Sequence, residues 1–220
     1  MVLSTGLNAQ EIPGVEESGI VYRKMMQGGV GIHSRGLSLH FRRGQRVHAG
    51  KVFLFDFALQ TIRHPKEVKS VSAFSNNNTG FLYGKVNSLN TLHTGAGFQR
   101  TLHQRTDVSS VAIGYSWFGG ISWPMATPVY LYILHYSEDE GIQERLERYN
   151  PDQHFPDQIA GRASWMKGVN KSRFYPGLYA SFQFYVDLSK QETNVRMLEA
   201  GLAADAYPAA IRIMADQQPG

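Results

Sequence analysis

The stretch Lys51-Val-Phe-Leu-Phe-Asp-Phe-Ala-Leu-Gln60 decides the fold class, because large apolar residues recur in it at every second position. Successive side chains of a β-strand point to opposite faces, so this period predicts a strand with two unlike faces. One face carries three phenylalanines and a leucine, and the other carries Asp56, Ala58 and Gln60.

The same alternation continues along the chain on both sides of this stretch. In residues 37–42, 111–117, 178–187 and 198–205, one face is apolar and the other mixes polar, charged and very small residues. With weaker segments included, the pattern predicts nine strands, at about 25–33, 36–43, 51–62, 81–92, 95–104, 108–119, 126–136, 173–188 and 194–206.

The composition agrees with an all-β domain and narrows the function classes. The chain has 220 residues, with 12 Phe, 11 Tyr and 22 Gly but only 18% charged residues. No apolar run exceeds six residues, so no segment has the roughly 20 apolar residues that a membrane-spanning helix needs. The absence of Cys excludes disulfides, thiolate metal sites and cysteine nucleophiles. The net charge of +4 comes without a basic run, which gives no support for nucleic acid binding.

Strand length and loop lengths favour a membrane barrel over a soluble sandwich. Several predicted strands reach the 9 to 11 residues that cross a bilayer at a tilt. The two long connections, 63–80 and 137–172, follow the third and seventh strands and therefore leave the same side of the sheet. We therefore predict an antiparallel up-and-down transmembrane β-barrel of about 8–10 strands. Within the second connection, Ser137 and Glu140 form a capping box that predicts a short helix ending before Pro151.

One barrel domain over residues 22–220 accounts for this pattern, preceded by a tail. Residues 1–21 are interpreted as the remainder of a signal peptide or as an N-terminal tail. Nine strands leave two unpaired edges, and the tail from Ala215 to Gly220 has the composition of a loop. We therefore expect a closing C-terminal strand to be encoded beyond Gly220.

Nine short motifs in a fixed order carry a family resemblance over residues 22–214. They are Phe41-Arg-Arg-Gly44, Arg63-His-Pro-Lys-Glu67, Tyr83-Gly-Lys-Val-Asn-Ser88, Gly97-Phe-Gln-Arg100, Pro128-Val-Tyr-Leu131, Arg148-Tyr-Asn-Pro151, Gly161-Arg-Ala-Ser164, Tyr175-Pro-Gly-Leu-Tyr179 and Asp205-Ala-Tyr-Pro208. In these motifs the chain resembles a family of outer-membrane β-barrel proteins from the Bacteroidota that carries no assigned reaction or ligand. The resemblance implies a barrel fold and an outer-membrane location. Such proteins continue past the last motif into one more aromatic-rich strand.

The alternation also predicts which side chains face the lumen and which face lipid. The outward faces should carry the phenylalanines at 53, 55, 57, 182 and 184. A barrel of this size is narrow enough for side chains to fill, and buried charges should pair. We therefore predict a plugged lumen with a charge network, in which Arg42 lies near Asp56 or Glu199; the polar residues assigned to the lumen are Arg42, Asp56, Gln183, Asp187, Glu199 and Asp205.

Two groups of polar residues are candidates for contacts in the long connections. The basic residues Arg63, His64 and Lys66 could meet lipopolysaccharide phosphates, although a solvated turn is the simpler interpretation. The residues Asp152, His154 and Asp157 could bind a divalent cation, but their spacing fixes no geometry and a solvated loop is the simpler interpretation. We assign no catalytic, cofactor-binding or metal-binding residue.

Three function classes follow from these observations. The first is a non-enzymatic outer-membrane barrel, a structural or accessory component of the cell envelope that contacts membrane lipid, lipopolysaccharide and other outer-membrane proteins. The second is a soluble lipocalin-like barrel, whose apolar faces line the inside and bind an apolar ligand. The third is a lipid-modifying outer-membrane enzyme, for which Ser38, His40 and Glu199 are the candidate nucleophile, base and acid, without a Gly-x-Ser-x-Gly elbow.

Overall fold

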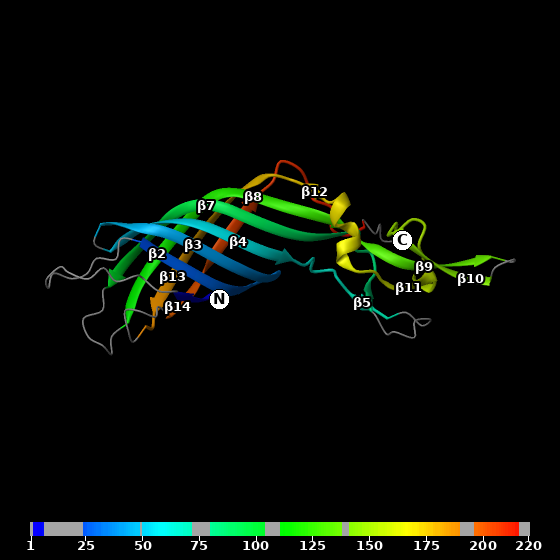
Figure 1. Ribbon diagram of the computed structural model, residues 1–220, viewed down its shortest axis with the longest axis horizontal. Helices are drawn as coiled ribbons and strands as arrows, with labels where there is room; N and C mark the ends of the chain where they lie inside the picture. The colour runs from blue at the N-terminus through cyan, green and yellow to red at the C-terminus, as the bar shows by residue number, and fades with distance from the viewer. Residues whose placement is uncertain are drawn as a thin grey trace. The chain divides into compact units, whose positions relative to one another are not determined.

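The computed structural model describes residues 2–6, 24–48, 50–71, 80–103, 111–137, 141–189 and 196–215, with the backbone alone for 2–6. The described chain is all-β apart from two 3-10 helices, η1 (Pro156–Gln158) and η2 (Trp165–Lys171). It forms two compact units (Figure 1), of which unit 1 comprises residues 1–61, 91–123 and 176–208, and unit 2 comprises 62–90, 124–175 and 209–220. No helix in the described ranges is long and apolar enough to span a membrane.

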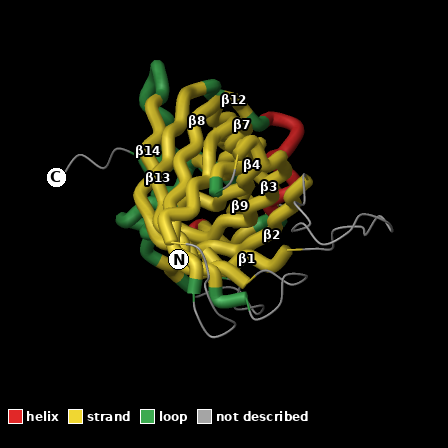
Figure 2. Tube along the Cα trace, turned by 90° about the vertical axis from the view of Figure 1, so that its left-hand side faces the viewer, coloured by secondary structure: helices red, strands yellow, loops and turns green. Residues whose placement is uncertain are grey.

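Unit 1 is a curved antiparallel sheet that forms a half-barrel (Figure 2). The full order of the sheet is β12-β8-β13-β14-β1-β2-β3-β4-β7, and β7 also pairs with β8. The bounds of its strands are β1 (Val2–Gly6), β2 (Lys24–His33), β3 (Gly36–His48), β4 (Lys51–Ile62), β7 (Asn87–His103), β8 (Ala112–Pro128), β12 (Arg173–Phe174), β13 (Gly177–Asp187) and β14 (Arg196–Ala206).

The predicted hairpin over 81–92 and 95–104 is wrong, because residues 87–92 and 95–103 belong to the single strand β7. Gly95, predicted as the first residue of the second strand, lies within β7 and is not among the glycines with positive φ, whereas Gly50 has φ 77° in the turn between β3 and β4. A Cβ at Gly95 would lie 2.4 Å from the carbonyl oxygen of Gly119. The glycine therefore permits close approach of two strands rather than a reversal of the chain.

The N-terminal segment differs from the tail expected over residues 1–21. Val2–Gly6 forms β1, which pairs with β14 on one side and with β2 on the other. It occupies the place in the sheet that we expected a strand beyond Gly220 to fill. Residues 7–23 lie outside the described part of the chain.

The two long connections leave unit 1 at the same end. Each neighbouring pair from β4 through β3, β2, β1, β14 and β13 to β8 is antiparallel, so β4 and β8 run in the same direction. The chain therefore leaves β4 and β8 at the same end of the sheet, β4 leading into 63–80 and β8 into β9, which precedes 137–172. These segments are not plain loops, because much of unit 2 is built from them.

Unit 2 contains a three-stranded sheet of order β10-β9-β11, made of β9 (Tyr130–Ser137), β10 (Gly141–Arg148) and β11 (Ile159–Arg162). A two-stranded sheet pairs β5 (Lys69–Ser70) with β6 (Phe81–Leu82). The buried core of the unit consists of Phe81, Leu131, Ile133, Tyr149 and Ile159. Unit 2 thus has an ordinary apolar core of its own.

The helix predicted between Ser137 and Pro151 is wrong. Gly141–Arg148 is strand β10, which pairs with β9 along its whole length, including Ile142 opposite Tyr136. Gly141 has φ 73°, a conformation that suits the reversal into β10. The pairing of β10 with the apolar strand β9 outweighs the local capping signal, because most helix stability comes from tertiary packing rather than from propensity.

Candidate functional site

Unit 1 has the reverse of the usual burial pattern. On β3, Arg42 is 2% exposed, whereas its neighbour Phe41 is 40% exposed and Leu39 is 58% exposed. On β4, Asp56 is 3% exposed beside Phe55 at 53%. The polar face of the sheet therefore lines the interior, and the apolar face lies outside.

Arg42 is the centre of a buried ion-pair network. Its Nε donates to Asp56 Oδ1 at 2.9 Å, and its Nη1 donates to the two Glu199 carboxylate oxygens at 2.8 and 2.9 Å. Its Nη2 donates to Gln183 Oε1 at 2.9 Å, and its guanidinium carbon lies 4.5 Å from the centroid of the Phe118 ring. One side chain thus links β3, β4, β13 and β14, with its charge paired and largely hydrogen-bonded.

A second cluster lies around His93 on β7. Its Nε2 lies 2.7 Å from Asp205 Oδ1, and its Nδ1 lies 3.3 Å from the Gln60 amide nitrogen. The imidazole stacks on Tyr179 with centroids 4.3 Å apart and an interplanar angle of 5°. The Tyr179 hydroxyl donates to Asp56 Oδ2 at 3.1 Å, which connects this cluster to the Arg42 network.

Two amides form a third buried contact in the same unit. Gln27 Nε2 donates to Gln99 Oε1 at 3.1 Å, and Gln99 Nε2 lies 3.8 Å from the sulfur of Met197. The Thr101 and Tyr185 hydroxyls are 2.8 Å apart. Polar contacts therefore fill much of the interior of unit 1 across six strands.

Ser38 and His40, two of the three residues considered for acyl transfer, do lie together. His40 Nε2 is 2.9 Å from Ser38 Oγ. The third, Glu199, instead binds Arg42, and the buried His40 Nδ1 has no hydrogen-bond partner among the described residues. A serine–histidine pair without an acid to orient the imidazole does not form a triad.

The structure brings together only part of the predicted lumen set. Arg42, Asp56, Gln183 and Glu199 meet, whereas Asp205 pairs with His93. Asp187, at the end of β13, accepts hydrogen bonds from the backbone and hydroxyl of Ser189. The reasoning from sequence missed His93, because the expected hairpin placed it next to a turn.

The basic candidates of the first long connection lie in a turn of unit 2. Arg63 and Lys66 are exposed, and His64 is half-buried. The His64 backbone N–H donates to Glu67 Oε1 at 3.1 Å, and Glu67 pairs with Lys85 at 2.6 Å. The turn is thus closed by the acidic residue and leaves the two basic side chains in solvent.

The three candidate metal ligands of the second connection do not converge. Asp152 and Asp157 are exposed, whereas His154 is buried. Its Nδ1 accepts from the Asn150 backbone N–H at 3.2 Å, so its Nε2 carries the proton and donates to Glu147 Oε2 at 3.1 Å. Within the described ranges, no group of three histidines and carboxylates could hold a metal ion.

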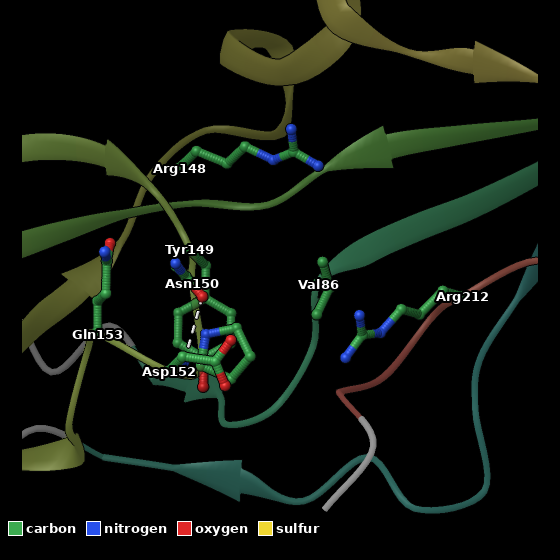
Figure 3. A pocket seen from close by; sticks show the side chains of 8 residues that line it. Val86, Arg148, Tyr149, Asn150, Asp152, Gln153 and Arg212 are labelled. Carbon is green, nitrogen blue, oxygen red and sulfur yellow. Dashed lines mark hydrogen bonds between the residues drawn. The ribbon is translucent and has the colours of Figure 1, made fainter.

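A shallow cavity of about 370 Å³ lies in unit 2 (Figure 3). Arg148 and Arg212 line it from separate segments, together with Val86, Tyr149, Asn150, Pro151, Asp152 and Gln153. The Gly84 N–H donates to the Tyr149 hydroxyl at 3.2 Å, and burial raises the pKa of that hydroxyl above its ordinary value.

Comparison of the chain with family models, curated proteins and solved structures gave no match.

Proposed function

We propose that this chain is a non-enzymatic outer-membrane β-barrel, a structural or accessory component of the cell envelope with a plugged lumen. The observation that carries the proposal is the reversed burial of unit 1, where Arg42 and Glu199 are 2% and 1% exposed while Phe55 is 53% exposed. In water this arrangement would be unfavourable on both faces. In a bilayer the outer face meets hydrocarbon, and the polar groups pair inside.

The exposed apolar residues extend over seven strands of unit 1. They include Val30 and Ile32 on β2, Leu37, Leu39 and Phe41 on β3, Phe55, Phe57 and Leu59 on β4, Leu92 on β7, Ile113 and Trp117 on β8, Phe182 and Phe184 on β13, and Leu202 on β14. Soluble monomers rarely expose contiguous apolar surface on this scale. A belt of this kind is what lipid would cover.

The strand order supports a closed barrel. Since β7 pairs with β4 and also with β8, the strands from β8 to β7 form a ring. This ring contains eight strands, and β12 is not one of them. Even strand numbers are the rule in bacterial outer-membrane barrels. Closure also removes the unpaired backbone groups that an open edge would leave in hydrocarbon.

The polar contacts of the interior support a plug rather than a pore. Arg42 ties together four strands across the inside of the unit, and Phe118 packs against its guanidinium. We expect the purified protein in planar bilayers to give no large, steady ion conductance. Such a conductance would contradict a plugged lumen.

The resemblance to the barrel family of the Bacteroidota and the proposed location agree with this function. The proposed partners are membrane lipid and lipopolysaccharide, together with other outer-membrane proteins. The soluble lipocalin-like alternative needs apolar side chains inside and charges outside. The burial of Arg42, Asp56 and Glu199 is the opposite arrangement.

The natural absence of cysteine allows a direct test with single-cysteine variants. Phe55 in unit 1 and Phe155 in unit 2 are 53% and 57% exposed, so they form a matched pair. In protein folded into lipid vesicles, Phe55→Cys should resist a water-soluble maleimide, whereas Phe155→Cys should react quickly. Both should react after unfolding in urea.

Equal labelling of the two cysteines in folded, vesicle-bound protein would overturn the proposal. Extraction gives an independent result on cells that express the chain. The protein should stay with the outer membrane through carbonate and salt washes and should leave it in detergent. A protein that washes off and stays soluble without detergent would favour the lipocalin-like alternative.

A further inference from the structure

A second apolar surface lies in unit 2, on η2 and the residues that follow it. Trp165, Met166 and Phe174 are 57%, 68% and 63% exposed. Trp165 and Met166 begin the short 3-10 helix η2, the yellow coil beside β12 in Figure 1, and Phe174 follows it in β12. We call residues 164–175 the aromatic segment.

The aromatic segment is held rigidly on the end of β8. Gly168 is buried, and a Cβ there would lie 2.2 Å from the carbonyl oxygen of Pro128. The Thr127 and Ser172 hydroxyls are 2.8 Å apart, and the Tyr175 N–H donates to the carbonyl of Pro124 at 3.1 Å. Gly168 is thus turned inward, while Trp165, Met166 and Phe174 are exposed in the part of the chain that the structure describes.

The charged residues in this part of the sequence have one sign. From Gln158 to Val186 the chain contains no Asp or Glu, but it carries Arg162, Lys167, Lys171 and Arg173. Exposed Trp and Phe beside Lys and Arg form the combination that lies in the headgroup layer of a membrane. An ordinary solvated surface would mix both signs of charge.

The chain connects this surface closely to the proposed lipid-facing strand. In β8, Trp117 is 46% exposed and Trp123 is 38% exposed. Phe174 pairs with Met125, only two positions after Trp123. The aromatic segment therefore pairs with the continuation of the strand that carries these two exposed tryptophans.

We infer that the aromatic segment is an interfacial anchor that binds the anionic headgroup layer of the membrane. This inference rests on the proposed barrel function, because the anchor adds a surface contact to a protein already in the bilayer. The occupant of the surface is lipid, with phosphate groups facing Lys167 and Arg173 and with the upper acyl chains around Trp165 and Phe174.

The three tryptophans allow the anchor and the barrel to be tested separately. One variant, Trp117→Phe with Trp123→Phe, keeps Trp165; a second, Trp123→Phe with Trp165→Phe, keeps Trp117. Each is folded into vesicles of phosphatidylcholine and phosphatidylglycerol whose acyl chains carry bromine near the headgroup or near the methyl end. We expect Trp165 to lose emission mainly to the shallow bromines, and Trp117 to the deep ones.

The outcomes distinguish the two proposals. Quenching of Trp117 without quenching of Trp165 overturns the anchor and leaves the barrel. Quenching of neither overturns both, and quenching of Trp165 alone keeps the membrane contact but overturns the barrel. Quenching of Trp165 mainly by deep bromines overturns the interfacial position.

The basic residues are tested in the variant that keeps Trp165. Its emission should shift further to the blue in vesicles with phosphatidylglycerol than in pure phosphatidylcholine. Lys167→Gln with Arg173→Gln should abolish that difference, whereas the control Arg145→Gln with Arg148→Gln, which removes the same charge from β10, should preserve it. No difference between the two lipids, or an equal loss in the control, overturns recognition of anionic headgroups by this segment.

Discussion

The two units of this chain use the same strand pattern with opposite faces inside. In unit 1, Arg42 and Glu199 are buried and Phe55 is 53% exposed; in unit 2, Leu131 and Ile133 are each 1% exposed. Alternation therefore predicts a strand but does not predict which of its two faces lies inside, because that depends on whether water or lipid surrounds the sheet. Unit 1 therefore has charged residues in its interior and large apolar residues on its outer face, whereas unit 2 has an apolar core.

The largest expected effect comes from removing the central cation of unit 1. Arg42→Met leaves the carboxylates of Asp56 and Glu199 buried without a partner, so it should lower the free energy of unfolding by about 3–5 kcal/mol. Urea titration of the protein folded in lipid vesicles measures this loss.

A control and a rescue accompany this variant. Arg43→Met alters the exposed neighbour and should cost less than about 1 kcal/mol. Adding Asp56→Asn and Glu199→Gln to Arg42→Met removes the two uncompensated charges and should recover part of the loss. A small loss for Arg42→Met alone would show that these carboxylates have access to water.

The next effect compares two isoleucines in opposite environments. Ile133 in unit 2 is 1% exposed, and Ile113 in unit 1 is 41% exposed. Ile133→Ala should cost about 2–5 kcal/mol, because it leaves a cavity in a packed core. In detergent, Ile113→Ala should cost clearly less. Thermal unfolding followed by near-ultraviolet circular dichroism compares them, and equal losses would contradict the assignment of inner and outer faces.

How far the sequence predicts the fold depends on how local the signal is. The strict alternation of residues 51–60 gives a strand with the observed bounds of β4, because period two is a local property. The continuation of β7 through Gly95 could not be predicted, since the role of this glycine depends on the close approach of β8, which is a tertiary contact. The helix signal at Ser137 failed for the same reason, because β9 supplies a partner strand that no local pattern announces.

In the site too, contacts between neighbouring strands could be predicted from the sequence, and contacts that depend on the whole sheet could not. Arg42 and Asp56 stand opposite each other across β3 and β4, so alternation and charge pairing are enough to suggest their contact. Glu199 and Asp205 both come from β14, far along the chain, and only the register of that strand in the sheet decides that Glu199 reaches Arg42 and Asp205 reaches His93. Unit 2 could not be separated from unit 1 by composition, because β5, β10 and β11 lie in segments expected to be long connections, whereas β9 lies in a segment predicted as a strand of the same sheet.

An arginine introduced in place of an exposed phenylalanine should have different effects on stability in the two units, although Phe55 and Phe155 are similarly exposed. Phe55→Arg in unit 1 should cost about 2–4 kcal/mol in a bilayer if position 55 lies near its midplane, and the same holds for Phe182→Arg. Phe155→Arg in unit 2 should change stability by less than about 0.5 kcal/mol, as for most surface substitutions. Urea titrations in lipid vesicles test this, and equal tolerance at the three positions would argue against lipid around unit 1.

The smallest expected effect lies at the carboxylate of Glu147 in unit 2, which faces two imidazoles. Its oxygens lie 2.9 Å from His135 Nε2 and 3.1 Å from His154 Nε2, and its side chain is 34% exposed. Water solvates such a group in the unfolded and folded states alike, so Glu147→Gln should lower the free energy of unfolding by less than about 1 kcal/mol. The exposed neighbour Glu144, changed to Gln, provides the baseline for removing one negative charge from β10. Paired urea titrations of both variants and of Arg42→Met compare a solvated carboxylate with a buried cation in one chain. A loss at Glu147 as large as that at Arg42 would mean that burial does not set the cost of breaking these pairs, and that unit 2 also depends on a polar interior.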